Sequence, residues 1–470
     1  MQQTIIFKMA YRNLWKNKRR TIITIISIGF GVTLCMLLTG ISDGSYYEFI
    51  TTAAKLGHGY ISIMNKNFYS ELSITDPING KELDIIEKTS HHEELTPQTV
   101  MFDKSPFKDL SPLEYLHSTS HSLSEEIISP NNLSQIKQLA AIFNKGITSF
   151  FGFEIRLGSS EANSDYLFAV SSKNGERESL MKFFEHEMPD HLKNLSEWRN
   201  LHNFTMKWSD PTSEINNNVL GLWLEFDTAH LTDNSNIPNI FLQIKKTRID
   251  SEEDEHKFKW ITQKALPLLT GATLPKNIEE NLINAIKKLP EGTALIHVGT
   301  MLSRQIKGVR IVINRIKPDQ IIPYLKSIGW KDETNKLIQI INEIDKYVSR
   351  LVLHINIGET VDPKIGLECS FAEDRYHLET EWEKFFDYLE NKGLCIQEKR
   401  KALLDFLGIE QEHNDYEFNF TTYMVAPKIK HSNYTSALVR YLSHIKIVYK
   451  PDYPLEAKAY LGVRLFGMEL

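Results

Sequence analysis

Five pairs of short segments, in which apolar and polar residues alternate, constrain the fold of this 470-residue chain more than any other feature. Alternation with a period of two is typical of a β-strand with one buried face. The pairs are FEIRLG with YLFAVSS, VLGLWLEFD with IFLQIKK, ALIHVGTMLS with VRIVINRI, RLVLHINIG with KIGLECSF, and HIKIVYK with EAKAYLGVRL. Turn-forming sequences such as GETVDP and KPDYP separate the partners and favour antiparallel hairpins. The sequence therefore predicts five β-hairpins within residues 126–470.

Segments with helical periodicity separate these pairs, and we expect helices at 178–188, 277–289, 333–348, 379–393 and 433–445. The first strands of the pairs start near residues 153, 219, 294, 351 and 444, a spacing too irregular for a solenoid. The pattern predicts an α+β domain in which helices are interleaved with hairpins.

Alternation also assigns each strand side chain to one of two faces. One face is aliphatic, as in Leu222 with Leu224 and Leu353 with Ile355, and the amphipathic helices are suited to cover it. The other face is mostly polar. It carries Glu154, Arg156, Trp223, Glu225, Asp227, Gln243, Lys245, His297, Arg310, Asn314, His354, Asn356, Glu368, His444, Lys446, Lys458, Tyr460 and Arg464.

Two architectures satisfy this two-faced pattern. One is an open antiparallel sheet with helices on one side and water on the other. The second is a closed ten-stranded barrel with helices outside and a polar lumen, since ten strands leave more interior space than eight. Five ββ units interleaved with helices resemble the αββα barrel of the aromatic prenyltransferases, in architecture and without a shared motif.

That resemblance implies a site for a prenyl diphosphate, which needs cationic donors, aromatic rings and a carboxylate base. The ligand-binding candidates are Arg156, Trp223, Lys245, Arg310, Lys446, Lys458, Tyr460 and Arg464. Glu225 or Glu368 is the candidate base. No paired-aspartate motif is present, which fits a metal-independent transferase, and no cofactor is indicated. For each charged residue, the alternative is a solvated sheet face.

A second hypothesis makes His297, His354 and His444 metal ligands, together with Glu225 or Glu368. Cysteine usage adds little, because Cys369 and Cys395 fit either a bridge or two buried thiols. The formal net charge of −6 gives no reason to expect nucleic-acid binding.

The N-terminus has a different character. Residues 21–41 carry no charge and, as a helix, span about 30 Å, the thickness of a bilayer core. Lys16, Lys18, Arg19 and Arg20 precede this span, so we expect an uncleaved single-pass anchor whose N-terminus is cytoplasmic. Residues 1–20 are expected to form a basic amphipathic helix on the membrane surface.

The stretch MAYRNLWKNKRRTIITIISIGFGVTLCMLLTGISDG, followed by AAKLGHGYISIMNKNFY, resembles the N-terminus of MacB/LolC/LolE/FtsX-like ABC transporter permeases. The resemblance covers residues 5–70, with 43–75 as the start of an extracytoplasmic domain. It implies a bacterial inner-membrane location, a separate ATPase partner and work on lipoproteins, peptides or lipids.

This permease-like start is not followed by the further membrane helices that the permease fold needs, because no later stretch is apolar for 18 residues. Residues 76–125 lack periodicity and indicate a linker. The chain therefore joins a permease-like start to an α+β domain that we expect to bind a small anionic molecule. The alternative is a diverged or truncated permease subunit without its own catalytic activity.

Overall fold

The computed structural model describes residues 101–102, 110–173, 175–228, 236–304, 308–371, 379–411 and 434–469. The amphipathic helix, the membrane anchor and the permease-like start predicted for residues 1–75 lie outside the described residues. Among the helices that are described, none combines the length and the apolar character needed to cross a bilayer.

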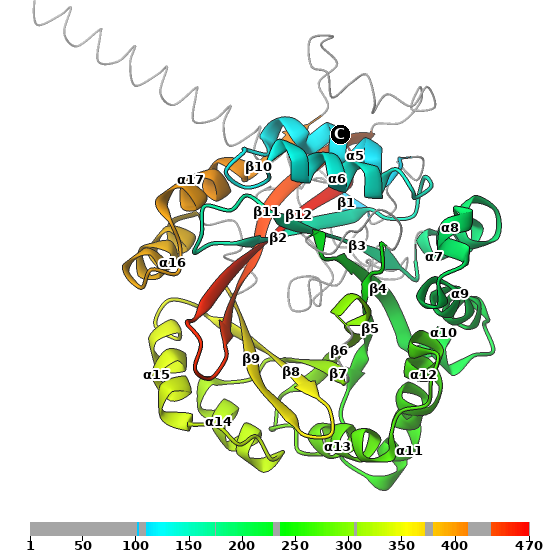
Figure 1. Cartoon of the computed structure of the whole chain (residues 1–470), viewed down its shortest axis with the longest axis vertical. Coiled ribbons are helices and arrows are strands. Elements are labelled where there is room, and N and C mark those ends of the chain that lie inside the picture. The colour runs from blue at the N-terminus through cyan, green and yellow to red at the C-terminus, as the bar shows by residue number, and fades with distance from the viewer. Residues whose placement is uncertain are drawn as a thin grey trace, which may run out of the picture. The chain divides into compact units, whose positions relative to one another are not determined.

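Ten antiparallel strands form a closed barrel, seen end-on in Figure 1. The strands are β2 (Phe150–Arg156), β3 (Ser164–Ser171), β4 (Val219–Phe226), β5 (Asn239–Thr247), β6 (Ala294–Thr300), β7 (Val309–Asn314), β8 (Arg350–Ile357), β9 (Val361–Ser370), β11 (Tyr434–Tyr449) and β12 (Glu456–Glu469). Each of the five predicted hairpins pairs as expected.

Closure depends on the last hairpin. β12 pairs with β2, with Lys458 opposite Arg156, and β11 pairs with β9, with Ile445 opposite Cys369. Because both sides of this hairpin are paired, the sheet has no opening between β9 and β2, and the open-sheet alternative is wrong.

The helices lie outside the barrel (Figure 1). They are α5 (Pro112–Thr119), α6 (Pro130–Ala140), α7 (Glu176–Lys182), α8 (Asp190–Lys193), α9 (Ser196–Ser209), α10 (Glu214–Asn218), α11 (Glu252–Trp260), α12 (Leu266–Thr270), α13 (Lys276–Lys287), α14 (Pro318–Ser327), α15 (Thr334–Ile344), α16 (Glu379–Asn391) and α17 (Gln397–Phe406). The described part of the chain also has the single helical turns η2 (Ser120–Ser122), η3 (Phe183–Glu187), η5 (Ile261–Ala265) and η6 (Leu302–Arg304).

The main hydrophobic core fills the layer between these helices and the barrel. On α9, Trp198, Phe204 and Trp208 are buried in the same cluster as Leu222 and Leu224 of β4. Burying an apolar side chain of this size contributes about 1.5–3 kcal/mol, so the aliphatic strand face is held outward. The polar strand face is thereby directed into the lumen.

Two segments differ from the sequence-based expectation. Pro112–Thr119, placed within the linker 76–125, forms α5; Ser111 and Glu114 cap its first turn reciprocally, and Tyr115 is buried. Residues 433–445, expected as a helix, belong to strand β11.

The helix prediction for residues 433–445 was wrong because of a β-bulge. Leu438, Leu442 and Ile445 follow helical spacing, and all three are buried in the outer core. A register shift between Leu442 and His444 changes the alternation by one residue, so these side chains share the outward face of a strand.

β11 and β12 are the longest strands, and their far ends pair with two short strands. β10 (Gly408–Gln411) pairs with β11, and β1 (Met101–Phe102) pairs with β12. The order β1-β12-β11-β10 therefore extends the last hairpin into a small four-stranded sheet.

The antiparallel topology separates the two ends of the barrel. The five hairpin turns lie at one end, which we call the turn end, and the helical connections join the strands at the other.

Candidate functional site

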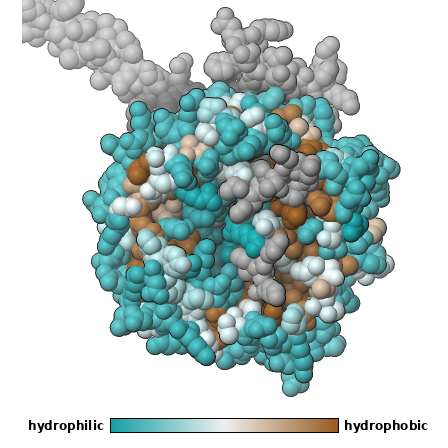
Figure 2. Space-filling model, in the orientation of Figure 1, coloured by the Kyte–Doolittle hydropathy of each residue, from teal (hydrophilic) through white to brown (hydrophobic). Residues whose placement is uncertain are grey.

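Inward-facing side chains enclose two adjoining cavities in the lumen. The polar cavity, of about 30 Å³, is lined by Glu154, Glu225, Arg304, Arg310, His354, Asn356, Lys364, Gly366, Lys446, Val448, Lys458 and Tyr460. The aromatic cavity, of about 160 Å³, includes Phe150, Trp223, Phe241, His297, Glu368, Tyr441, His444 and Arg464 in its lining. Glu225, His354, Lys446 and Tyr460 line both, so the cavities meet at these residues. In Figure 2, hydrophilic residues lie around the hollow at the centre of the view.

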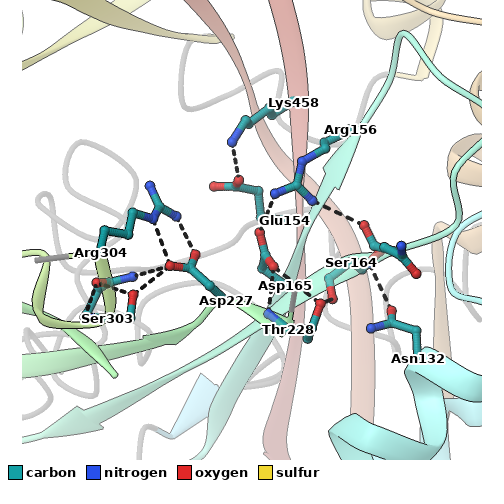
Figure 3. Close-up of polar contacts among 12 residues, drawn as sticks. Asn132, Glu154, Arg156, Ser164, Asp165, Asp227, Thr228, Ser303, Arg304 and Lys458 are labelled. Carbon is teal, nitrogen blue, oxygen red and sulfur yellow. Dashed lines mark hydrogen bonds and ion pairs between the residues drawn. The ribbon is translucent and has the colours of Figure 1, made fainter. Parts of the chain in front are cut away.

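Among the described residues, five cationic side chains and two carboxylates line the polar cavity. Lys458 Nζ lies 2.6 Å from Oε1 of Glu154 (Figure 3), and the Tyr460 hydroxyl donates to the other carboxylate oxygen. Burial alone would raise the pKa of Glu154, but Lys458 and Lys446 hold that pKa well below its usual range. Glu154 is therefore an anion that fixes Lys458 and Tyr460 in place.

Lys446 lies where the two cavities meet and is 8% exposed. Burial lowers its pKa to about 8, and the nearby Arg310 acts in the same direction, while Glu368 and Glu154 oppose the shift. Its ammonium lies 5.2 Å from the centroid of the Tyr460 ring. Lys446 thus places a charge at the junction of the two cavities.

Arg304 reaches the polar cavity from turn η6 instead of from a strand. Two hydrogen bonds to Asp227, one of 2.7 Å from Nε, orient its guanidinium (Figure 3). Asp227 also accepts from Ser303 and Asn239, so its position is fixed by strand β5 of its own hairpin and by the β6–β7 connection. This bidentate pairing presents the remaining face of the guanidinium to the cavity.

Glu225 is enclosed in the lumen where the two cavities meet. Burial raises its pKa to about 7; Glu154 adds to the rise, and Lys446 and Arg310 oppose it. A carboxyl that titrates near neutral pH can accept or return a proton during a reaction. Of the two candidate bases, Glu225 has the more suitable pKa.

Glu368 has a different environment, because two histidines contact it. Its Oε1 lies 2.5 Å from His354 Nε2 and 3.3 Å from His444 Nε2. Burial lowers the pKa of His354 to about 3 and that of His444 to about 4, while the histidines keep the pKa of Glu368 well below its usual value. Glu368 is thus a carboxylate held between two neutral imidazole rings.

The metal hypothesis finds no support in this geometry. Across the described residues, no group of three or more His, Cys, Asp or Glu side chains is arranged to hold a metal ion. His297 also lines the aromatic cavity, and its buried Nε2 has no hydrogen-bond partner.

Aromatic rings form much of the wall of the second cavity. Phe150 lies edge-on to Trp223 with centroids 5.1 Å apart, and Tyr441 lies 6.1 Å from Phe150. His444 stacks on Tyr460 with centroids 4.3 Å apart. These rings present polarisable faces on which a planar or cationic carbon group can rest.

The structure brings most of the predicted site residues together. Eight of them line one or both cavities: Trp223, Glu225, Arg310, Glu368, Lys446, Lys458, Tyr460 and Arg464. Arg156 lines neither cavity; its side chain is 37% exposed and pairs with Asp165 at 3.1 Å. Lys245 is exposed, because an irregularity between Gln243 and Thr247 interrupts the register of β5.

Sequence reasoning missed several lumen residues. Lys364 lies on the same strand face as Glu368, four residues earlier, so alternation could have found it. Arg304 had no such signal, since it lies in a turn. Phe241 lies on the same face of β5 as Gln243, two residues earlier, so alternation could have found it too, whereas Tyr441 lies next to a β11 irregularity that hides the period of two.

Comparison with known proteins gives structural likenesses but no sequence family. No family model and no curated protein matches the chain, so the permease resemblance of residues 5–70 gains no support from either comparison. The apo form of prenyltransferase PriB aligns with a TM-score of 0.42 and 9% identity, covering 75% of this chain and 94% of that one.

Two further solved structures give similar values. AnaPT from Neosartorya fischeri has a TM-score of 0.42 and 14% identity, covering 75% of this chain and 91% of that one. The 5-dimethylallyltryptophan synthase from Streptomyces coelicolor has a TM-score of 0.40 and 10% identity, with 75% and 98% covered. Likenesses at this level carry no weight for the chemistry of the lumen, which depends on this chain's own side chains.

Proposed function

We propose that the lumen binds the diphosphate ester of a short allylic hydrocarbon and transfers the hydrocarbon to an acceptor without a metal ion. The observation that carries this proposal is the junction of a cation-lined cavity with an aromatic cavity at Glu225. A diphosphate needs several positive donors, and a hydrocarbon needs an apolar wall. Both requirements are met side by side.

The cavity volumes restrict the size of the hydrocarbon. An apolar cavity of about 150 Å³ is large enough for benzene. The aromatic cavity of about 160 Å³ therefore suits a five-carbon group. The polar cavity of about 30 Å³ is smaller than a diphosphate group, so binding requires its cationic side chains to move apart around the ligand.

The proposed reaction breaks the bond between the allylic carbon and the diphosphate oxygen. The electron pair leaves with diphosphate, whose added charge Arg304, Arg310 and Lys458 stabilise. The allylic cation rests against Trp223 and Tyr460. A carbon or heteroatom of the acceptor supplies the new bond, and Glu225 takes the proton that the acceptor loses.

Binding tests the first half of this proposal. Calorimetric titration of the full chain with dimethylallyl diphosphate should show binding that weakens in Lys458→Ala and Arg310→Ala. The expected loss is about 1.5–3 kcal/mol for each, because each removes hydrogen bonds to a charged group. Lys245→Ala is the matched control, since Lys245 is exposed and should not affect affinity. Equal affinity in all three variants, or no binding at millimolar ligand, would refute the proposal.

Turnover tests the second half. Formation of dimethylallylated indole from dimethylallyl diphosphate and indole should fall at least about 100-fold in Glu225→Gln, in line with the usual contribution of a general base. Binding of the diphosphate should persist in this variant, because the uncharged amide leaves the cations in place. If binding occurs in the wild-type protein but no dimethylallylated indole is ever detected, the lumen is a binding site without transferase activity.

A further inference from the structure

A third cavity, of about 850 Å³, lies at the turn end outside the lumen, and we call it the rim cavity. Its described walls come from the α12–α13 connection, from residues 300–302 and 308–309 and from the β8–β9 hairpin. Leu274, Ile278 and Met301 supply apolar surface, while Thr273 and Thr360 supply hydroxyl groups. Its volume lies in the range of small-molecule sites.

Hydrogen bonds attach one wall of the rim cavity, the β8–β9 turn, to the helical layer beside it. Asn281 of α13 donates its amide hydrogens to the carbonyl oxygens of Gly358 and Glu359, at 3.0 and 2.9 Å. Trp330 donates from Nε1 to the carbonyl oxygen of Pro363 at 3.3 Å. The β8–β9 turn is therefore attached to the helical layer on both sides, so the wall is preformed.

Asn356 connects the rim cavity to the lumen, because it lines both the rim cavity and the polar cavity. Its Nδ2 donates to Asp362 in the rim cavity at 3.1 Å. Its Oδ1 accepts from Nε of Arg310 in the lumen at 2.8 Å. A molecule in the rim cavity thus lies one side chain away from the diphosphate-binding cations.

The described linings of the two cavities differ in charge. The described lining of the rim cavity contains the carboxylates Glu359 and Asp362 and neither lysine nor arginine. The polar cavity has five cations. An amine with an apolar body complements the rim cavity, whereas a phosphate or carboxylate ligand would meet negative charge there.

We propose that the rim cavity binds an amine-bearing amphipathic molecule that is too large for the lumen. The rim cavity of about 850 Å³ is larger than the aromatic cavity of about 160 Å³, and it meets the polar cavity at Asn356. The preference for an amine rests on the rim cavity alone.

A charge-reversed pair of probes tests this preference. Tryptamine and indole-3-propionate share an indole ring and carry opposite charges. Titrated into the full chain, tryptamine should bind at least about tenfold more tightly, and Glu359→Gln should reduce that preference. Equal affinity for the two probes, or a preference for indole-3-propionate, would overturn the proposal.

A blocking variant locates the binding. Ala272 is exposed and lines the rim cavity, so Ala272→Trp fills the space without disturbing the core and should weaken tryptamine binding at least about tenfold. Ala141 is exposed at the end of α6, and Ala141→Trp is the matched control, which should bind tryptamine as the wild-type protein does. Unchanged binding in Ala272→Trp would refute the assignment.

Inorganic pyrophosphate separates this proposal from the proposed function. It should bind Ala272→Trp and the wild-type protein equally, because the lumen cations are intact in both. If pyrophosphate fails to bind while tryptamine binding responds to Ala272→Trp, the lumen function is wrong and the amine site stands. If pyrophosphate binds but tryptamine binding does not respond to Ala272→Trp, the amine site is wrong and the lumen function stands.

Discussion

Glu225 shows, at the scale of a single residue, how the lumen determines chemistry. A carboxyl enclosed among aromatic rings and cations keeps its proton to about pH 7, although an exposed glutamate loses it near pH 4.5. Glu154, a short distance away in the same lining, has the opposite shift because Lys458 and Tyr460 bind its anion. Two glutamates in one lumen are therefore suited to different tasks, one to exchange a proton and one to hold a charge.

The pKa of Glu225 predicts a measurable effect on stability. Between pH 4.5 and 7 the folded protein holds this proton more tightly than the unfolded chain does. Glu225 therefore lowers the free energy of unfolding as the pH rises through this range, and the loss is complete above pH 7. Glu225→Gln removes this loss. As the pH rises from 4.5 to 7, the free energy of unfolding of the variant should therefore increase relative to that of the wild-type protein by up to roughly 3 kcal/mol.

Urea denaturation of both proteins across this pH range measures the difference. The comparison is needed because the buried His354 and His444 have lowered pKa values, so their contribution to stability rises with pH over much of the same range. A difference that stays constant with pH would show that Glu225 titrates at its ordinary value.

At the scale of strands, two inward-facing glycines make room for the aromatic wall. A Cβ at Gly299 of β6 would overlap the ring of Phe241 on β5. A Cβ at Gly462 of β12 would lie 2.6 Å from Cζ of Tyr441 on β11. Each ring thus lies over a glycine of the neighbouring strand, where no side chain occupies the space that the ring needs.

Gly299→Ala tests this packing. The added methyl group must displace Phe241 within a closed sheet, so the free energy of unfolding should fall by about 1–3 kcal/mol. Gly158→Ala is the control, since a Cβ there meets its nearest atom at an ordinary 3.5 Å. Chemical denaturation of both variants gives the comparison, and equal stability would contradict the close approach.

Strand alternation explains how much of the site was predictable. Trp223, Glu225, Lys458 and Tyr460 lie in regular strands, so a period of two assigned them correctly to one face. Lys245 was predicted to face inward and is exposed, because the register of β5 shifts before it. Bulges depend on pairing with a neighbouring strand, and a single segment of sequence does not specify that pairing.

At the scale of the whole domain, the sequence left barrel closure open, and the structure shows closure. Closure requires Phe153 of β2 to lie opposite Leu461 of β12, more than 300 residues away along the chain. The register of all ten strands must agree for this pairing to form, so no local pattern could decide it. The predicted membrane anchor and ATPase partner remain predictions, since residues 1–100 lie outside the described residues.

The pairing of β2 with β12 offers a test of closure. A Cβ at Gly152 would overlap the backbone carbonyl oxygen of Leu461, which has no rotamer by which to move away. Gly152→Ala should therefore separate the two strands, and amide hydrogen exchange should accelerate in β2 and β12 while β6 and β7 remain protected. Equal exchange rates of β2 and β12 in the variant and the wild-type protein would show that the pairing of these two strands does not keep the barrel closed.

The small sheet β1-β12-β11-β10 has a consequence for the behaviour of the protein at high concentration. A closed barrel leaves no row of unpaired backbone groups, and an extended last hairpin would expose two such rows on its far half. Among the described strands, the outer positions of that sheet are taken by β1 and β10, two and four residues long. Strands this short are poor templates for intermolecular β-pairing, so self-association through sheet edges and the growth of fibrillar aggregates should be disfavoured.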